Sequence, residues 1–322
     1  MGVADKQIKV GIRTIWDVPK EEYFGPGQLT CAGCGPSLAV RHILKAAGPN
    51  TIIANATGCI EVTTTQYPYT AWAVPYIHVA FENAAAVASG IESAIKALNR
   101  KGLANTKAKV IALAGDGGTY DIGIQALSGM LERGHGVLYV LYDNEAYMNT
   151  GIQRSGGTPR FAWTTTSPVG SKIRGKVQSK KDIMSIVIAH RVPYAATASI
   201  AYPLDLMNKV KKALDALDEG PTFLHVFAPC PPGWRIDESK TVEIARLAVE
   251  TGVFPLYEWD HGKFRLNPPS NNHIDKSKRK PLINYLKPQG RFAHMKEDEI
   301  KAMEAEIDSY WDYLTKLLKA FG

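Results

Sequence analysis

Short apolar runs and amphipathic segments alternate along this chain, without internal repeats. Each apolar run is about six residues long and ends at glycine or at polar residues, as buried strands do. The runs that predict strands are 51–56, 110–114, 137–142 and 222–227. The segments with helical spacing are 36–47, 82–98, 181–190 and 204–217. This alternation predicts an α/β fold with parallel strand pairing.

Polar residues follow two of these predicted strands. Asp116 comes directly after the run 110–114, and Asn144 comes after the run 137–142. Open α/β sheets hold ligands at the carboxyl ends of their strands. A carboxylate, an amide oxygen and a backbone carbonyl of the following turn are ligands that suit Mg²⁺, and phosphates and water complete its shell. The pair therefore predicts a metal-bridged diphosphate site.

Glycines surround Asp116 in the sequence 115–118 (GDGG). They allow the backbone to come close to an anion, and the helix that follows would direct free N–H groups toward it before ending at Gly134. A Gly-Asp-Gly tripeptide alone is usually a turn. Joined to Asn144, 28 positions later and also at a strand end, it indicates a cofactor site.

Longer motifs carry a family resemblance. The pair Asp116 and Asn144 looks like the thiamine-diphosphate motif, and the segments 121–129 (DIGIQALSG) and 142–159 (YDNEAYMNTGIQRSGGTP) resemble the β subunit of pyruvate:ferredoxin oxidoreductase and its 2-oxoacid:ferredoxin relatives. The resemblance spans residues 25–290. It implies a doubly wound, mainly parallel sheet of the thiamine-diphosphate-binding type with a C-terminal extension.

The resemblance also implies cofactors and site residues. Thiamine diphosphate, Mg²⁺ and a [4Fe–4S] cluster are expected, with coenzyme A as co-substrate. The cofactor-binding residues that it implies are Thr57, Gly58, Gly115, Asp116, Gly117, Gly118, Asn144, Ala146, Asn149 and Thr150. Among these, Asp116, Asn144 and Ala146 are the expected Mg²⁺ ligands. Asn149 resembles a catalytic residue that faces the substrate side of the thiazolium ring, although a structural role in the turn is an open alternative.

The chain has four cysteines, each close to glycine or proline: Cys31, Cys34, Cys59 and Cys230. Four thiolates suffice for one [4Fe–4S] cluster, and the family's cluster ligands match these four. Scattered core thiols and a disulfide framework are weaker alternatives, because the first two cysteines form a C-x2-C pair and the chain is long. Structural zinc is the stronger alternative, since Cys₄ sites also hold that metal.

Composition agrees with a cytoplasmic enzyme subunit. The 322 residues are 45% hydrophobic and 21% charged, and the formal net charge is +7. We find no apolar stretch long enough to span a bilayer and no signal-peptide pattern at the N-terminus. Basic residues are not gathered around aromatic ones, which disfavours nucleic-acid binding. The positive charge is compatible with an acidic partner such as ferredoxin, or with an ordinary basic surface.

We divide the chain into an α/β domain, 1–255, which holds the cofactor and the cluster, and a C-terminal arm with a terminal helix, 256–322. Residues 1–24 form an N-terminal extension of the first domain. The stretch 158–180 reads as a functional loop beside the cofactor, and 267–291 as an arm. The apolar face of the terminal helix consists of Ile300, Met303, Ile307, Tyr310, Leu314, Leu317 and Phe321. This face either covers the sheet or contacts another subunit.

One catalytic element has no candidate in this chain. Thiamine enzymes activate the cofactor with a glutamate, and neither Glu61 nor Glu82 lies in a context that identifies it as that residue. The resemblance therefore implies an α subunit that completes the site and further subunits that carry electrons to ferredoxin. Pyruvate is the favoured substrate, while branched 2-oxoacids, 2-oxoglutarate and oxalate stay open. The rival functions are a non-redox thiamine-dependent decarboxylase or lyase subunit with structural zinc, and a non-catalytic phosphate-binding subunit.

Overall fold

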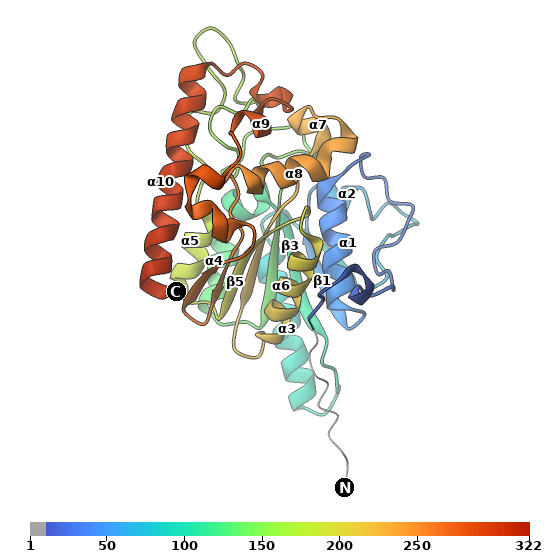
Figure 1. Ribbon diagram of the computed structural model, residues 1–322. Helices are drawn as coiled ribbons and strands as arrows, with labels where there is room; N and C mark the ends of the chain where they lie inside the picture. Colours follow the sequence, from blue (N-terminus) through green and yellow to red (C-terminus); the bar gives the residue numbers. More distant parts are fainter. Residues whose placement is uncertain (1–10) are drawn as a thin grey trace.

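The computed structural model describes residues 11–322, which form one eight-stranded sheet with helices on both faces (Figure 1). The first ten residues of the predicted extension 1–24 lie outside this range. The strand order is β2-β1-β3-β4-β6-β5-β7-β8, in which β1 to β6 are parallel and β7 and β8 are antiparallel. The strands are β1 Thr51–Ala56, β2 Tyr76–Val79, β3 Lys109–Gly115, β4 Val137–Asp143, β5 Tyr194–Ser199, β6 Thr222–Phe227, β7 Tyr257–Asp260 and β8 Lys263–Leu266. The predicted doubly wound, mainly parallel sheet is confirmed.

Ten α-helices connect or cover these strands in the described range. They are α1 Gly35–Ala47, α2 Cys59–Val62, α3 Ala84–Arg100, α4 Ile124–Glu132, α5 Ile183–Ala189, α6 Pro203–Asp215, α7 Pro231–Trp234, α8 Thr241–Glu250, α9 Ile283–Leu286 and α10 Glu297–Phe321. Short 3₁₀ turns lie at Ile15–Asp17, Glu238–Lys240, Ser270–Ile274, Lys276–Lys278 and Gly290–Phe292, and a π-helical turn lies at Gly117–Asp121.

The two faces of the sheet bury two separate cores. Along β3, Ile111 and Leu113 pack with α1, α6 and α8, whereas Val110, Ala112 and Ala114 pack with α3, α4, α5 and α10. Side chains of a strand point alternately to opposite faces, so a strand that is apolar throughout must be covered on both. The continuous apolar runs of the sequence therefore become the central strands.

The predicted strands and helices appear close to their expected bounds. Strands that the sequence pattern did not predict, β2 and β5 among them, have weak sequence signals. β5 (YAATAS) is half alanine, and β2 is a short edge strand whose middle residues are exposed. The hairpin β7–β8 turns through His261 and Gly262, with φ angles of 50° and 83°, as two-residue hairpin turns require. It extends the sheet from within 256–322, and the domain division at residue 255 stays a prediction.

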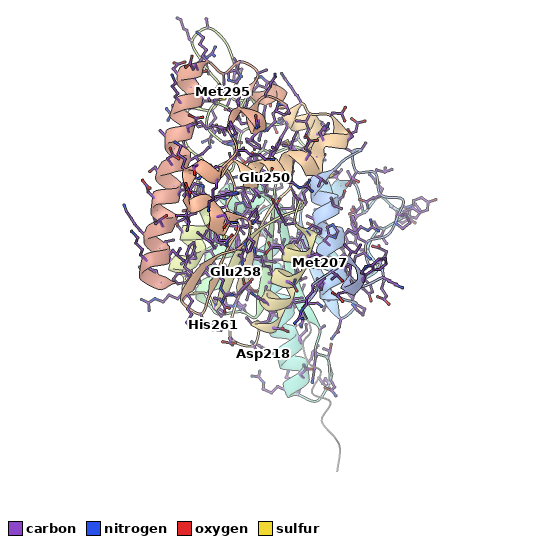
Figure 2. The ribbon with its side chains drawn as sticks, in the orientation of Figure 1. Met207, Asp218, Glu250, Glu258, His261 and Met295 are labelled. Carbon is purple, nitrogen blue, oxygen red and sulfur yellow. The ribbon has the colours of Figure 1, made fainter. Side chains whose placement is uncertain are left out.

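Buried polar contacts attach this hairpin to strand β5 and helix α6. Glu258 of β7, labelled in Figure 2, accepts hydrogen bonds from the Tyr194 hydroxyl of β5 at 2.8 Å and from Lys212 Nζ of α6 at 2.6 Å. The pairing of a buried carboxylate with two donors offsets its loss of hydration. The hairpin is thus a fixed part of the sheet.

The terminal helix α10 lies along one side of the molecule, against the sheet (Figure 1). Met303 and Leu314 of its predicted apolar face are fully buried, whereas Phe321 is 46% exposed and meets the Trp259 ring edge-on at 5.3 Å. Trp311, which the predicted face did not include, is buried and donates to Gly252 O at 2.8 Å. Of the two roles expected for this face, the structure shows the covering of the sheet. None of the described helices combines the length and apolar character needed to cross a membrane.

Candidate functional site

The candidate site lies where the winding of the sheet reverses. From β1 the chain proceeds to β2 on one side and later to β3 on the other, so the carboxyl ends of β1 and β3 flank the point of reversal. Thr57 follows β1 there, and Asp116 follows β3. Asn144 follows β4, the next strand in the sheet. Such reversal points are where open α/β sheets bind ligands.

Three oxygen atoms meet between the ends of β3 and β4. The side-chain oxygen of Asn144 lies 2.9 Å from Asp116 Oδ1 and 2.9 Å from the backbone oxygen of Ala146. Turned over, the amide would present its NH₂ group to the same two acceptors. Adjacent ligands of a six-coordinate ion with bonds of about 2.0–2.1 Å also stand about 2.9 Å apart. These three residues, which we call the metal corner, therefore fit an oxygen-coordinated divalent cation.

The turn that forms the metal corner has an unusual backbone. Glu145, between Asn144 and Ala146, has a φ of 68°, in the left-handed region that non-glycine residues seldom adopt. Its side chain is held on both sides, because Lys180 Nζ lies 2.8 Å from Oε1 and Arg291 Nη2 lies 2.7 Å from Oε2. These ion pairs hold the turn in the conformation that brings the Ala146 carbonyl toward Asn144.

Lys180 also neutralises the residue before Asn144. Its Nζ lies 2.7 Å from Asp143 Oδ2, which receives a second contact at 2.7 Å from His225 Nε2 and a hydrogen bond at 3.0 Å from the Tyr120 hydroxyl. Burial alone would raise the pKa of Asp143, but Lys180 and His225 hold it well below its usual range. Asp143 is therefore stabilised in its charged form.

Asp116 has no such compensation. Burial, and then the negative charge of Asp143, raise the pKa of Asp116 well above its ordinary value. A hydrogen bond from the Ser155 hydroxyl to Oδ2 and the more distant charge of Lys180 offset only part of this rise. A carboxylate that is this buried needs a nearby positive charge. A divalent cation at the metal corner would supply it.

The segment that follows the metal corner in the sequence packs over it, and we call this covering segment the roof. Gly157 is so close that a Cβ atom there would stand 3.1 Å from the Asp116 Cβ. The Thr158 hydroxyl donates to the backbone oxygen of Glu145 at 2.6 Å, and the buried Lys176 donates to the backbone oxygen of Ser179 at 3.1 Å. The loop 158–180 thus begins beside the metal corner, and its functional role stays a prediction.

The buried side chain of Tyr142 lies close to the ends of both β1 and β3. The Tyr142 ring lies 3.1 Å from the position of a Cβ atom at Gly115, and its hydroxyl lies 3.0 Å from that of a Cβ atom at Gly58. Both distances are shorter than most real Cβ contacts, so a larger residue at either position would have to displace the tyrosine ring. On the same edge, the Thr57 hydroxyl donates to Val79 O at 3.2 Å and meets His78 Nε2 at 2.8 Å. The structure thereby places Thr57 and Gly58, after β1, and Gly115, at the end of β3, on the two sides of the reversal point.

Gly117 and Gly118 begin the π-helical turn after Asp116. A Cβ atom at Gly117 would lie 2.3 Å from the Tyr147 ring, so only glycine fits there. Tyr147 stacks on Phe81 with ring centroids 5.6 Å apart and donates to Asp121 at 3.1 Å. Ile122, which directly follows the π-helical turn, is 54% exposed. Helix α4 begins only at Ile124. The π-helical turn before it shifts which residues face the core.

The four cysteines, which we call the cysteine corner, lie at one end of the molecule near the same sheet edge. All are free thiols. Cys59 begins α2 after β1, Cys34 precedes α1, and Cys230 precedes α7 after β6. Burial, with the nearby charges of the other three cysteines, raises the pKa of Cys59 to about 12. Within residues 11–322, no three Cys, His, Asp or Glu side chains gather closely enough to hold one metal ion.

The metal corner and the cysteine corner touch each other. The indole of Trp234, at the end of the α7 turn that Cys230 begins, donates to the backbone oxygen of Asn144 at 2.7 Å. On the same turn, a Cβ atom at Gly233 would collide with Met148 Sδ at 2.2 Å. The Arg291 guanidinium lies 3.6 Å above the Trp234 ring. The turn carrying one thiol thus rests directly on the turn carrying the metal-site oxygens.

Two predicted residues lie apart from the buried oxygens. Asn149 and Thr150 are exposed, in the turn between Tyr147 and Gln153, and the Thr150 hydroxyl donates to the Gln153 side chain. The catalytic role of Asn149 stays a prediction. The residues that sequence reasoning missed are mostly charged ones of the supporting shell: Asp143, Glu145, Ser155, Lys180, His225 and Arg291. Asp143 and Glu145 could have been noticed because they adjoin Asn144 in the sequence. Lys180 and Arg291 could not, because only the fold brings them near the site.

Comparisons with known proteins agree with this geometry. Residues 56–226 match the family described as thiamine pyrophosphate enzyme, C-terminal TPP binding domain. The chain is 57% identical to pyruvate synthase subunit PorB of Methanocaldococcus jannaschii, covering 91% of this chain and 97% of that protein. It is 52% identical to the PorB subunit of Methanothermobacter marburgensis, with the same two coverages.

Two further likenesses widen this group. Ketoisovalerate oxidoreductase subunit VorB of Pyrococcus abyssi is 49% identical, and the match covers 95% of this chain and 96% of that subunit. Among solved structures, a 2-oxoglutarate:ferredoxin oxidoreductase from Magnetococcus marinus superposes with a TM-score of 0.57 at 19% identity, covering 93% of this chain and 97% of that one. At this identity the structural likeness shows the fold alone.

Proposed function

Because this chain belongs to the 2-oxoacid:ferredoxin oxidoreductase family, as a subunit of the pyruvate synthase type, we propose that it is the catalytic β subunit of such a complex. In this proposal the complex converts pyruvate and coenzyme A reversibly to acyl-CoA and CO₂. The electrons leave through a [4Fe–4S] cluster toward ferredoxin. The relatives named as pyruvate synthase subunits favour pyruvate, and the similar VorB subunit makes a branched 2-oxoacid the next candidate.

The metal corner is the observation that carries the proposal. Asp116 Oδ1, the Asn144 amide oxygen and the Ala146 carbonyl would hold Mg²⁺, which would bridge to the diphosphate of thiamine diphosphate. Thiamine diphosphate, when bound, supplies the nucleophilic carbon at which a 2-oxoacid loses CO₂. This chain's own residues bind and orient: Asp116 and Asn144 would present their oxygens to the metal, and the roof over Asp116 would keep water from the metal ligands.

The cysteine corner supports the redox half of the proposal. Cys31, Cys34, Cys59 and Cys230 would hold the cluster, whose iron would replace the thiol protons and supply positive charge beside the buried sulfur of Cys59. The contact between Trp234 and Asn144 supports a short path between the thiamine site and the cluster. A redox role needs this proximity, whereas a structural zinc ion would not.

A second polypeptide is part of the proposal. Glu82 is exposed, and Glu61 Oε1 lies 3.6 Å from His78 Nδ1, so neither glutamate is assigned the activation of the thiamine ring. We assign that role to an α subunit, and further electron transfer to other cluster-bearing subunits and to ferredoxin. The complex would work in the cytoplasm, with no nucleic acid or membrane as partner.

The test is an anaerobic reconstitution. The chain, with iron, sulfide, Mg²⁺ and thiamine diphosphate restored, is assayed against a panel of 2-oxoacids with a viologen acceptor, alone and after addition of the partner subunits. We expect iron rather than zinc, no turnover alone, and turnover highest with pyruvate once the partners are present. Zinc with non-oxidative decarboxylation would establish the rival function, and substantial turnover by the single chain would refute the division of the site.

A further inference from the structure

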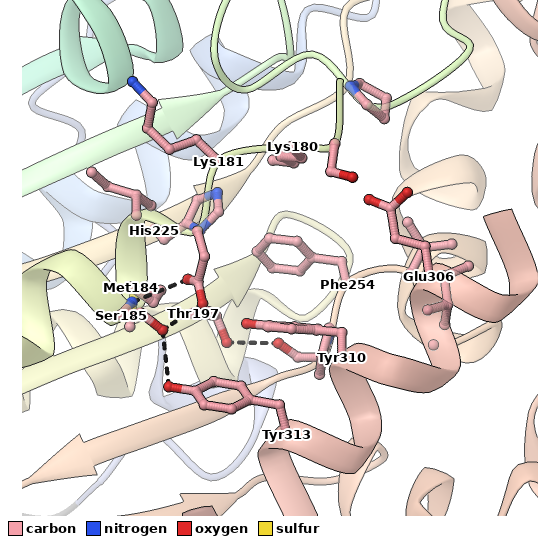
Figure 3. A pocket seen from close by; sticks show the side chains of 18 of the residues that line it. Lys180, Lys181, Met184, Ser185, Thr197, His225, Phe254, Glu306, Tyr310 and Tyr313 are labelled. Atoms are coloured by element: carbon pink, nitrogen blue, oxygen red, sulfur yellow. Dashed lines mark hydrogen bonds between the residues drawn. The ribbon is translucent and has the colours of Figure 1, made fainter. Parts of the chain in front are cut away.

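A cavity of about 620 Å³ lies behind the metal corner, between α10, the start of α5 and the ends of β5 and β6 (Figure 3). Its volume is in the range of pockets that bind small molecules, about 300–1,000 Å³. The metal corner residues do not line it, but Lys180 and Glu145 of the supporting shell do. The cavity is therefore a separate space that shares a wall with the site described above.

Much of the lining is apolar. Phe254 forms one wall, and Met303 and Ile307 of α10 form another. The tyrosine hydroxyls around the cavity already have partners, since Tyr310 bonds to the Tyr257 hydroxyl at 3.0 Å and Tyr313 to Ser185 Oγ at 3.0 Å. These tyrosines thus offer ring surface rather than free hydrogen-bonding groups.

Most charged groups of the lining are also satisfied within the chain. Lys180 lies between the two carboxylates that flank Asn144 in sequence. Lys181 stands 3.6 Å from Asp121 and donates to a backbone oxygen. Asp182 accepts the Ser185 N–H at 3.0 Å as the cap of α5. A ligand would have to compete with existing bonds to use any of these groups.

Two buried polar atoms of the lining have no partner among the described residues. One is Oε2 of Glu306, and the other is Nε of Arg160, whose guanidinium stacks over the Phe161 ring at 4.8 Å. Figure 3 shows the Glu306 carboxylate projecting from α10 toward the space between Lys180 and Phe254. Native proteins seldom leave such atoms unpaired unless water or a ligand meets them. Glu306 Oε2 lacks a hydrogen-bond donor, and Arg160 Nε lacks an acceptor.

We propose that this cavity binds a free amino acid with an apolar side chain. The ammonium group would donate to Glu306 Oε2, the carboxylate would accept from Arg160, and the side chain would lie among Phe254, Met303 and Ile307. A zwitterion is the simplest ligand that brings one cation and one anion into an otherwise apolar space without leaving a net charge buried. The proposal does not depend on the proposed function.

Calorimetric titration of the purified chain with L-leucine tests this directly. We expect saturable binding of one molecule per chain. Two analogues of leucine test the two charges separately: 4-methylpentanoate lacks the ammonium group, and 3-methylbutylamine lacks the carboxylate. Loss of either charge-assisted bond should weaken binding by about tenfold or more. Equal affinity for leucine and both analogues, or no saturable binding of leucine, valine or phenylalanine, would overturn the proposal.

A matched pair of variants on α10 locates the site. Glu306→Gln keeps the side-chain shape but removes the charge, and should weaken leucine binding by about tenfold. Glu304→Gln removes a charge from the same helix outside the cavity lining and should leave binding unchanged. Circular dichroism and thermal unfolding show whether each variant is folded, and the analogue series supplies the same comparison without mutation. Unchanged leucine affinity in folded Glu306→Gln would place the amino acid elsewhere and overturn the assignment.

Discussion

The metal corner and the cysteine corner lie against each other, yet the chain completes them to different degrees. Asp116, Asn144 and Ala146 are each exposed by 3% or less and are covered by the chain's own loop. Cys31, in contrast, is exposed, and a hollow of about 360 Å³ opens beside it and Cys34. The metal corner is thus enclosed by the chain itself, whereas the cysteine corner is open beside Cys31 and Cys34.

This contrast follows from what each corner has to do. A hard cation needs fixed oxygens and a dry surrounding, so the buried ion pairs of Lys180 and Arg291 belong beside it. In the proposed function, a redox cluster at the cysteine corner would pass its electrons out of the chain, and the exposure of Cys31 agrees with that role. Large apolar side chains near the thiols in sequence also stay exposed, Leu29 at 66% and Tyr67 at 97%. The chain thus encloses its metal corner and leaves the cysteine corner open to other proteins.

The largest effect is expected from the metal corner itself. Asp116→Ala should lower Mg²⁺-dependent affinity for thiamine diphosphate by about 100-fold or more, because it removes the formal charge among the three ligands. Asn144→Ala removes a neutral ligand and should cost about tenfold. Titration of the cofactor into the complex, with unfolding curves as a check on the fold, measures both. Equal losses in the two variants would contradict the role of the carboxylate.

A shared centre at the cysteine corner is tested by two distant thiols. Cys230→Ser and Cys31→Ser should disturb the same iron–sulfur spectrum, because a four-iron cluster cannot keep its full coordination with one ligand replaced. Anaerobic electron paramagnetic resonance and iron analysis compare the two variants with the parent chain. A full four-iron signal in either variant would exclude that cysteine as a ligand.

The buried ion pairs should matter more to the metal corner than the exposed ones. Lys180→Met removes the cation that Asp143 and Glu145 share and leaves each carboxylate with its remaining partners alone, so it should lower the free energy of unfolding by about 3–5 kcal/mol. Lys181→Met removes a half-exposed neighbour and should cost about 1 kcal/mol or less. Urea unfolding of both variants gives the comparison. Similar small losses would show that the network around Asn144 contributes little.

The smallest effect concerns the attachment of the roof. Arg174, in the loop over the metal corner, donates to both oxygens of Glu299 on α10 at 2.9 and 3.0 Å, and this pair lowers the pKa of Glu299 to about 2. Since the folded pKa lies below the ordinary value of about 4.5 for a glutamate, the stabilisation is present above pH 4.5 and is lost as the pH falls toward 2.

Glu299→Gln should therefore lower the free energy of unfolding by about 1–2 kcal/mol at neutral pH. The difference from the parent chain should shrink between pH 4.5 and 2, and urea midpoints measured across this interval test it. Glu297→Gln is a matched control, because Glu297 lies two residues earlier in α10, is exposed, and pairs with Lys301 at the surface. A loss that does not change with pH would show that the ion pair is not its cause.

The sequence was sufficient for the parts of the site that local pattern determines. Asp116 and Asn144 were recognisable because each ends an apolar strand, and the parallel sheet then brought those ends together. Lys180 and Arg291 were not, because nothing near them in the chain indicates a carboxylate partner. They reach Glu145 only after the loop 158–180 and the segment after α9 have packed over the sheet. Long-range ion pairs of this kind leave no periodic signal.

The central claim is that three oxygens of this chain hold the metal of a thiamine site. A crystal of the complex grown with thiamine diphosphate and Mn²⁺, in place of Mg²⁺, locates the metal by anomalous scattering. The account predicts one peak within bonding distance of Asp116 Oδ1, the Asn144 amide oxygen and the Ala146 carbonyl, with the diphosphate on its open side. A metal bound instead to Asp143 or Glu145, or an Asn144 NH₂ group that still faces Asp116 beside bound cofactor, would contradict it.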